Sequence, residues 1–165
     1  MCIRDRPQMV PLSALKDADP GEVHLAYAPA VPPATKRKEP RRFDVHLEVT
    51  EGMGDLDPSN NVMTEVWGFK VFGDDSKTAG APGPVIRGRV GDVVRVTLTN
   101  PSTNKHPPNI DFHAVTGMHG GASDLLVPPG ESAAIQARLL TPAASRYSAT
   151  AAKLPTHIAR GMNAI

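Results

Sequence analysis

Hydrophobic and polar side chains alternate over residues 43–49. Phe43, Val45, Leu47 and Val49 are apolar, and the residues between them are polar. Because successive side chains on a strand point to opposite faces, this pattern predicts a half-buried β-strand, with His46 on its solvent side.

Similar patterns continue along the chain. We expect further strands over residues 62–72, 84–89, 92–99, 109–115 and 132–140, a weaker strand over 146–150, and a short helical turn over 154–160. Glycine-containing turns separate them, including Val90-Gly91 and the polar loop 73–83. Seven or so short strands without a long helix predict an all-β, Greek-key β-sandwich over residues 43–165. Its expected core contains Val45, Leu47, Val94, Val96, Leu98, Ile110, Phe112 and Ile135.

Residues 1–42 are expected to form an extended, proline-rich N-terminal arm, since proline removes donors and favours extended geometry. Residues 1–6 show no strand or helix pattern and are interpreted as a non-native scar. The segment Lys36–Arg42 carries five basic residues, which we interpret as a solvated linker.

Composition narrows the function classes. The 165 residues suit one domain, and a formal net charge of +1 gives no reason to expect nucleic acid or an anionic membrane as a partner. Cys2 is the single cysteine, so no internal disulfide can form. No apolar run reaches the length of a membrane span, and no signal peptide is visible.

The candidate chemistry begins at Asp111 and His113. On a strand these side chains would share a face, which would place a proton donor beside an imidazole metal ligand. The glycines of the turn 116–122 would let backbone approach that site. An isolated Asp-x-His pattern is also compatible with one solvated carboxylate and one core histidine.

Three segments carry a specific resemblance: PGPVIRGRVGD at 82–92, NIDFHAVTG at 109–117 and HIARGM at 157–162. In order and spacing they resemble the first cupredoxin (plastocyanin-like) domain of copper-containing nitrite reductases, as does the arm leading into the strand at 45–49. The resemblance implies reduction of nitrite to nitric oxide with type 1 and type 2 copper. It also implies an electron-donor protein, a homotrimer and a periplasmic location.

Carried over position by position, the resemblance assigns four residues. Asp111 falls on the proton-relaying aspartate and His113 on a type 2 copper ligand. His157 and Met162 fall on an imidazole ligand and the axial ligand of type 1 copper. His119, in the glycine-rich turn, is expected to be exposed, although it lies close to the type 2 position.

The chain departs from the family at three ligand positions. Pro108 stands where the family has a type 1 histidine, and His106 would need a register shift to replace it. The family's adjacent His-Cys pair aligns with Ser148 and Ala149; counting back from His157 instead places Ser148 at the cysteine. Neither alignment provides a thiolate, so we expect no blue copper centre and no activity of this chain alone.

We expect that the chain is a fragment, in which the family's second cupredoxin domain is absent and the first is truncated at its C-terminal strand. One alternative is a metal-free cupredoxin kept as a structural or interaction module. The other is an electron-transfer or multicopper-oxidase domain, which is disfavoured because both the cysteine and the His-x-His pairs of such proteins are missing.

Overall fold

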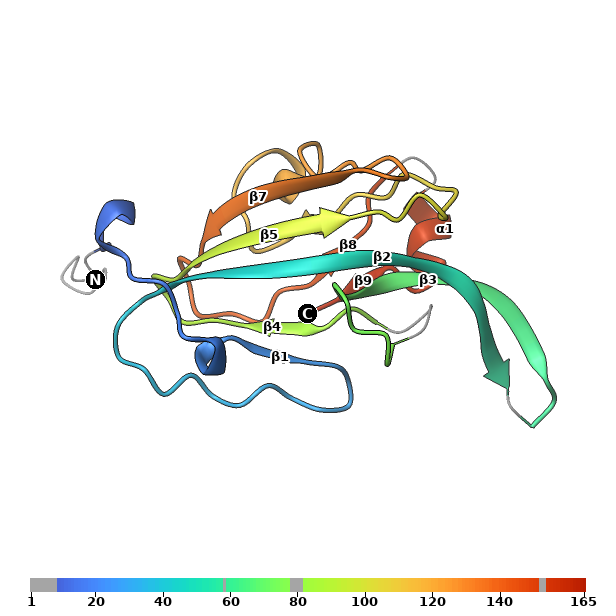
Figure 1. Ribbon diagram of the computed structural model, residues 1–165, viewed down its shortest axis with the longest axis horizontal. Helices are drawn as coiled ribbons and strands as arrows, with labels where there is room; N and C mark the ends of the chain where they lie inside the picture. The colour runs from blue at the N-terminus through green and yellow to red at the C-terminus, as the bar shows by residue number, and fades with distance from the viewer. Residues whose placement is uncertain (1–8, 58, 78–81, 152–153) are drawn as a thin grey trace, which may run out of the picture.

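A computed structural model describes residues 9–57, 59–77, 82–151 and 154–165, so the proposed scar at 1–6 lies outside the described residues. The regular structure of these residues consists mainly of β-strands, with a single short α-helix (Figure 1). The elements are β1 (His24–Ala26), β2 (Arg42–Asp57), β3 (Val62–Val71), β4 (Val85–Arg87), β5 (Val93–Thr99), β6 (Asp111–Phe112), β7 (Ser132–Arg138), β8 (Tyr147–Ser148), α1 (Leu154–Ala159) and β9 (Asn163–Ala164), with short 3-10 turns η2 (Leu12–Ala14), η3 (Pro20–Glu22) and η4 (Met118–Gly121).

One layer is a four-stranded sheet in the order β3-β2-β5-β7. Its central strand β2 follows the alternation in the sequence: Phe43, Val45, Leu47 and Val49 are all buried. The β2–β5 pair is parallel, whereas the β2–β3 and β5–β7 pairs are antiparallel. The parallel pair is formed by strands distant in sequence, so no hairpin turn dictates its direction.

The second layer contains the sheets β6-β8-β9 and β1-β4. Backbone hydrogen bonds join them, from Gly83 N to Asn163 O at 3.2 Å and from Ile86 N to Ile165 O at 3.0 Å. Most of the predicted core is buried, including Leu98 and Ile110 at 0% exposure, while Phe112 and Ile135 are half-buried at its margin. The predicted all-β sandwich is therefore confirmed.

The arm is more structured than the sequence indicated. It includes β1, which pairs with β4, and two 3-10 turns. The interpretation of Lys36–Arg42 as a solvated linker is wrong at Arg37, whose side chain is 6% exposed and pairs with the buried carboxylate of Asp92. Composition alone did not show that one cation of this run has a buried partner.

The strand expected over 109–115 is only Asp111–Phe112, and that expected over 146–150 is only Tyr147–Ser148. The chain turns directly after β6, where Val115 N donates to Phe112 O at 2.8 Å. The helical turn predicted over 154–160 is present as α1. No helix in the described ranges is long and apolar enough to cross a membrane.

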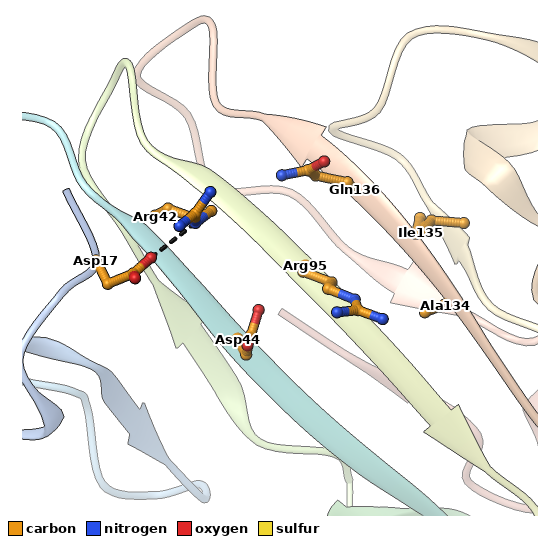
Figure 2. A pocket seen from close by; sticks show the side chains of 7 residues that line it. All are labelled: Asp17, Arg42, Asp44, Arg95, Ala134, Ile135 and Gln136. Atoms are coloured by element: carbon orange, nitrogen blue, oxygen red, sulfur yellow. Dashed lines mark hydrogen bonds and ion pairs between the residues drawn. The ribbon is translucent and has the colours of Figure 1, made fainter. Parts of the chain in front are cut away.

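A shallow groove lies on the outer face of the first sheet, across β2, β5 and β7 (Figure 2). Its charged side chains are two acids and two bases, and Arg42 Nε is 2.7 Å from Asp17 Oδ1. None of the predicted site residues lines this groove.

Candidate metal centre

The predicted type 2 position is built on the short β6–β8 pair. Asp111 lies directly opposite Ser148 in the antiparallel register, so their side chains share a face of the sheet. Asp111 is half-buried, and Ser148 is 2% exposed. A carboxylate therefore faces a buried hydroxyl at the position where the resemblance places a second imidazole.

His113 lies outside β6, on the turn that follows. His113 is exposed, and its backbone N–H donates to Arg146 O at 3.1 Å. Strand alternation therefore extends only to Phe112, so it does not by itself place His113 on the face of Asp111.

The turn η4 packs against β6 through Gly120. A Cβ atom at Gly120 would meet Asp111 Oδ1 and the backbone of Phe112, whose nitrogen would be 2.7 Å away. His119 beside it is exposed and has the unusual left-handed angles φ 49° and ψ 42°. The glycine-rich turn thus brings backbone close to Asp111, as the sequence predicted.

The predicted type 1 position lies at one end of the core. Ala149 N donates to Met162 O, and Met162 N donates to His157 O, both at 3.1 Å. All three residues are buried: Ala149 is 0% exposed, Met162 1% and His157 3%. Three of the four positions that the resemblance assigns to one copper are thus connected by backbone contacts.

The fourth position, Pro108, is buried next to this group, and its carbonyl accepts a hydrogen bond from Val127 N at 2.9 Å. The neighbouring Asn109 holds the two segments together. Its Oδ1 accepts from Thr150 N at 2.6 Å, and its Nδ2 donates to Thr150 Oγ1 at 3.2 Å. The segment at Pro108 therefore runs beside the segment at Ala149.

Trp67 also belongs to this region, although no sequence pattern connects β3 to the loop at 157–162. Its buried ring has the ring of His157 at 5.1 Å in an edge-on arrangement and the ring of His106 at 4.3 Å. The guanidinium of Arg160 lies 4.9 Å from the same ring. Trp67 therefore contacts both histidines and orders the end of the sandwich.

His106 is held in place by Glu51 as well as by Trp67. Glu51 Oε1 lies 3.2 Å from the ring Nδ1 of His106 and accepts the backbone N–H of His106 at 2.9 Å; Oε2 accepts that of Lys105 at 3.0 Å. Moving His106 into the position of Pro108 would break these contacts.

The residues present do not fit either copper set. A blue copper site needs two imidazoles and a thiolate with a weak axial thioether, and proline and alanine side chains offer no donor atom. In the described ranges, no group of three or more His, Cys, Asp or Glu side chains is placed to hold a metal ion. Position 148 has a hydroxyl, which is a poor substitute for an imidazole.

Two layers of short strands, with a buried loop group at one end, define a cupredoxin-type sandwich. The solved copper nitrite reductase of Nitrosomonas europaea matches it with a TM-score of 0.64 and 28% identity, over 75% of this chain and 40% of that one. A multi-copper oxidase from Pseudomonas thermotolerans matches with a TM-score of 0.59 and 25% identity, over 76% and 29% of the two chains.

Sequence comparison identifies the relatives more narrowly. The copper-containing nitrite reductase of Neisseria meningitidis is 36% identical over 136 residues, which are 82% of this chain and 33% of the relative. That of Alcaligenes xylosoxydans is 40% identical over 101 residues, 56% of this chain and 31% of the relative. No protein-family model matches. The chain is a homologue of the copper-containing nitrite reductases and spans about a third of the length of these relatives.

Proposed function

We propose that the chain corresponds to the first cupredoxin domain of a copper nitrite reductase and that, on its own, it does not reduce nitrite. Homology and fold support the family assignment. The observation that carries the second part is Ala149. It is fully buried at the position where a type 1 site needs its thiolate, and its backbone N–H donates a hydrogen bond to Met162 O.

Reduction of nitrite to nitric oxide and water consumes one electron and two protons. In the proposed assignment, Asp111 would move protons and His113 would bind type 2 copper. The register supports the part of Asp111, because it places this carboxylate on the same face as Ser148, which aligns with a type 2 imidazole of the family. Pro108, Ser148 and Ala149 do not complete a copper ligand set, so this chain would lack the metal that accepts the electron.

The partners proposed for the family role are nitrite and an electron-donor protein. Homotrimer assembly and a periplasmic location complete that role. Each rests on the nitrite reductase relatives, of which this chain spans about a third.

The test is to add Cu(II) to the purified chain and record the visible spectrum. Nitrite-dependent nitric oxide formation is then measured with a chemical reductant. The N. meningitidis relative serves as the positive control. We expect no intense thiolate-to-copper absorption and no turnover. Either signal above that of a chain-free control would overturn the proposal.

A second candidate function is a metal-free structural or interaction module. The observation that favours it is the continuity of the core, since Ala149 and Met162 belong to the same buried apolar cluster as Trp67 and Tyr147. For such a module, the unfolding midpoint should be unchanged by Cu(II) and by a chelator. A copper-dependent rise in the midpoint would exclude it.

A further inference from the structure

Two exposed methionines lie on the β2–β3 hairpin, which extends beyond the rest of the molecule (Figure 1). Met53 is 60% exposed and Met63 is 47% exposed. The register places Met53 opposite Glu65 and Asp55 opposite Met63. Opposite residues of an antiparallel pair share a face, and so do residues two apart on one strand, so the two thioethers are diagonal neighbours on one face. Diagonal neighbours are about 7–8 Å apart, a gap that two flexible methionine side chains can close.

The same face of the hairpin continues to Glu51, which lies opposite Trp67 in the register. His106 contacts both of these residues. Its backbone N–H donates to Glu51 Oε1 at 2.9 Å, and its ring is 4.3 Å from the ring of Trp67. Met53 is two residues beyond Glu51 on the strand, so its side chain leaves the same face about 7 Å further along. The face therefore presents an imidazole next to two thioethers.

The ring of His106 has the orientation that a metal ligand needs. Glu51 Oε1 lies 3.2 Å from Nδ1, and Nδ1 is buried although the side chain is 36% exposed. The exposed part of the ring therefore lies away from Nδ1, on the side of Nε2. Nε2 makes no hydrogen bond to any residue in the described part of the chain. A carboxylate beside one ring nitrogen is typical of metal-binding histidines, because it fixes the tautomer and leaves the other nitrogen as the donor atom.

The charge of the hairpin favours a cation. Residues 51–66 include four acidic residues and no basic residue. Arg160, which pairs with Glu65 at 2.8 Å, and Lys105, whose backbone is bonded to Glu51, offset two of these charges, so the local excess is negative. In the described ranges, no group of three or more His, Cys, Asp or Glu side chains is placed to hold a metal ion. The donors available here are thioethers and an imidazole, which suit a soft ion.

We propose that Met53 Sδ, Met63 Sδ and His106 Nε2 form a surface site for a soft monovalent cation, and that this cation is Cu(I). Thioether ligands select Cu(I), and an imidazole also suits copper, whereas the harder ions Mg(II) and Ca(II) require oxygen ligands. The site shares no residue with the type 1 and type 2 positions. It is therefore independent of the proposed nitrite chemistry.

The first test is NMR spectroscopy of the full chain with methionine labelled at its methyl carbon, titrated with Ag(I) as a redox-inert substitute for Cu(I). Cys2→Ser is present in every sample, because a thiolate would compete for the ion. The methyl signals of Met53 and Met63 should shift together and saturate at a single equivalent. The signal of Met9, which is 48% exposed and lies beside Arg138, should not move. Unshifted signals of Met53 and Met63, or an equal shift of Met9, would overturn the proposal.

The second test measures Cu(I) affinity by competition with bathocuproine disulfonate, without oxygen and with ascorbate present. Met53→Leu with Met63→Leu keeps the shape of two exposed side chains and should abolish binding, whereas Met9→Leu is the matched control and should leave the dissociation constant unchanged. Circular dichroism checks that the variants are folded. Binding that the double variant does not weaken would show that the ion is held elsewhere.

Two further variants test the histidine. Glu51→Gln retains an oxygen for the backbone N–H groups but removes the charge beside Nδ1, and should weaken Cu(I) binding about tenfold. His106→Asn should weaken it further, and His119→Asn, at an exposed histidine, is the control that should not. An affinity that depends on His119 and not on His106 would refute the assigned ligand set.

Discussion

Arg37 places its guanidinium on the buried carboxylate of Asp92, with Nη1 2.6 Å from Oδ1 and Nη2 bonded to Oδ2. The two side chains are 6% and 0% exposed. Asp92 also accepts the backbone N–H groups of Arg41 at 2.9 Å and Arg89 at 2.6 Å. One carboxylate therefore joins the arm to the turn before β5.

Arg37→Ala should lower the free energy of unfolding by about 3–5 kcal/mol, because it leaves Asp92 charged, buried and without its cation. Lys36→Ala is the matched control, since this neighbour is exposed and unpaired, and should change stability by less than about 0.5 kcal/mol. Urea denaturation followed by tryptophan fluorescence measures both. Equal effects of the two substitutions would contradict the assigned role of the pair.

Gly120→Ala should destabilise the fold by about 1–3 kcal/mol. Gly120 has φ 54°, and an added Cβ would meet Asp111 and the backbone of Phe112. Gly21→Ala is the control, because no atom lies within 4 Å of a Cβ built there. Thermal unfolding of the two variants decides the point; a Gly120→Ala midpoint equal to that of Gly21→Ala would show that η4 does not pack closely on β6.

Tyr147 predicts a pH dependence. Burial raises the pKa of its phenol far above the usual value of 10.0, and its hydroxyl donates to Pro84 O at 2.7 Å. A raised folded-state pKa means that stability is complete below the unfolded pKa, about 10, and is lost progressively at higher pH.

Tyr147→Phe should therefore cost about 1–3 kcal/mol at pH 7, where the Pro84 carbonyl loses its donor, and should reduce the loss of stability above about pH 10. Urea denaturation at pH 7 and pH 11 provides the comparison. A wild-type chain whose stability falls no more steeply than that of the variant would contradict this explanation.

Pro108→His combined with Ala149→Cys should create a blue or green copper site with His157 and Met162. The physical reason is that all four positions are buried, and a thiolate selects copper. Backbone hydrogen bonds join Ala149, Met162 and His157, and the Asn109 side chain holds the segment of Pro108 beside them. The change is followed as visible absorption during titration with Cu(II). Ala149→Cys alone should bind copper more weakly, and Ala122→Cys, a buried cysteine elsewhere, should give no such band. A folded double variant that stays colourless would refute the assignment of ligand positions.

The sequence predicted the fold where its pattern was regular. In β2 and β5 the alternation of Val45, Leu47, Val96 and Leu98 reports burial directly, since one face of a strand must leave water. At β6 the same reasoning extended the strand too far. The chain turns after Phe112, where η4 packs against β6 through Gly120. The alternation of apolar and polar residues does not report this contact.

By itself, the sequence determined the all-β class, the places of β2, β3, β5 and β7 along the chain, the chemical identity of each candidate ligand position and the absence of a thiolate at position 149. These follow from local periodicity and side-chain chemistry. The tertiary structure decided which positions meet: Ala149 with Met162, His157 with Trp67, and Arg37 with Asp92. Such contacts join segments far apart in the chain, and they form because packing and burial, rather than spacing along the sequence, select each partner.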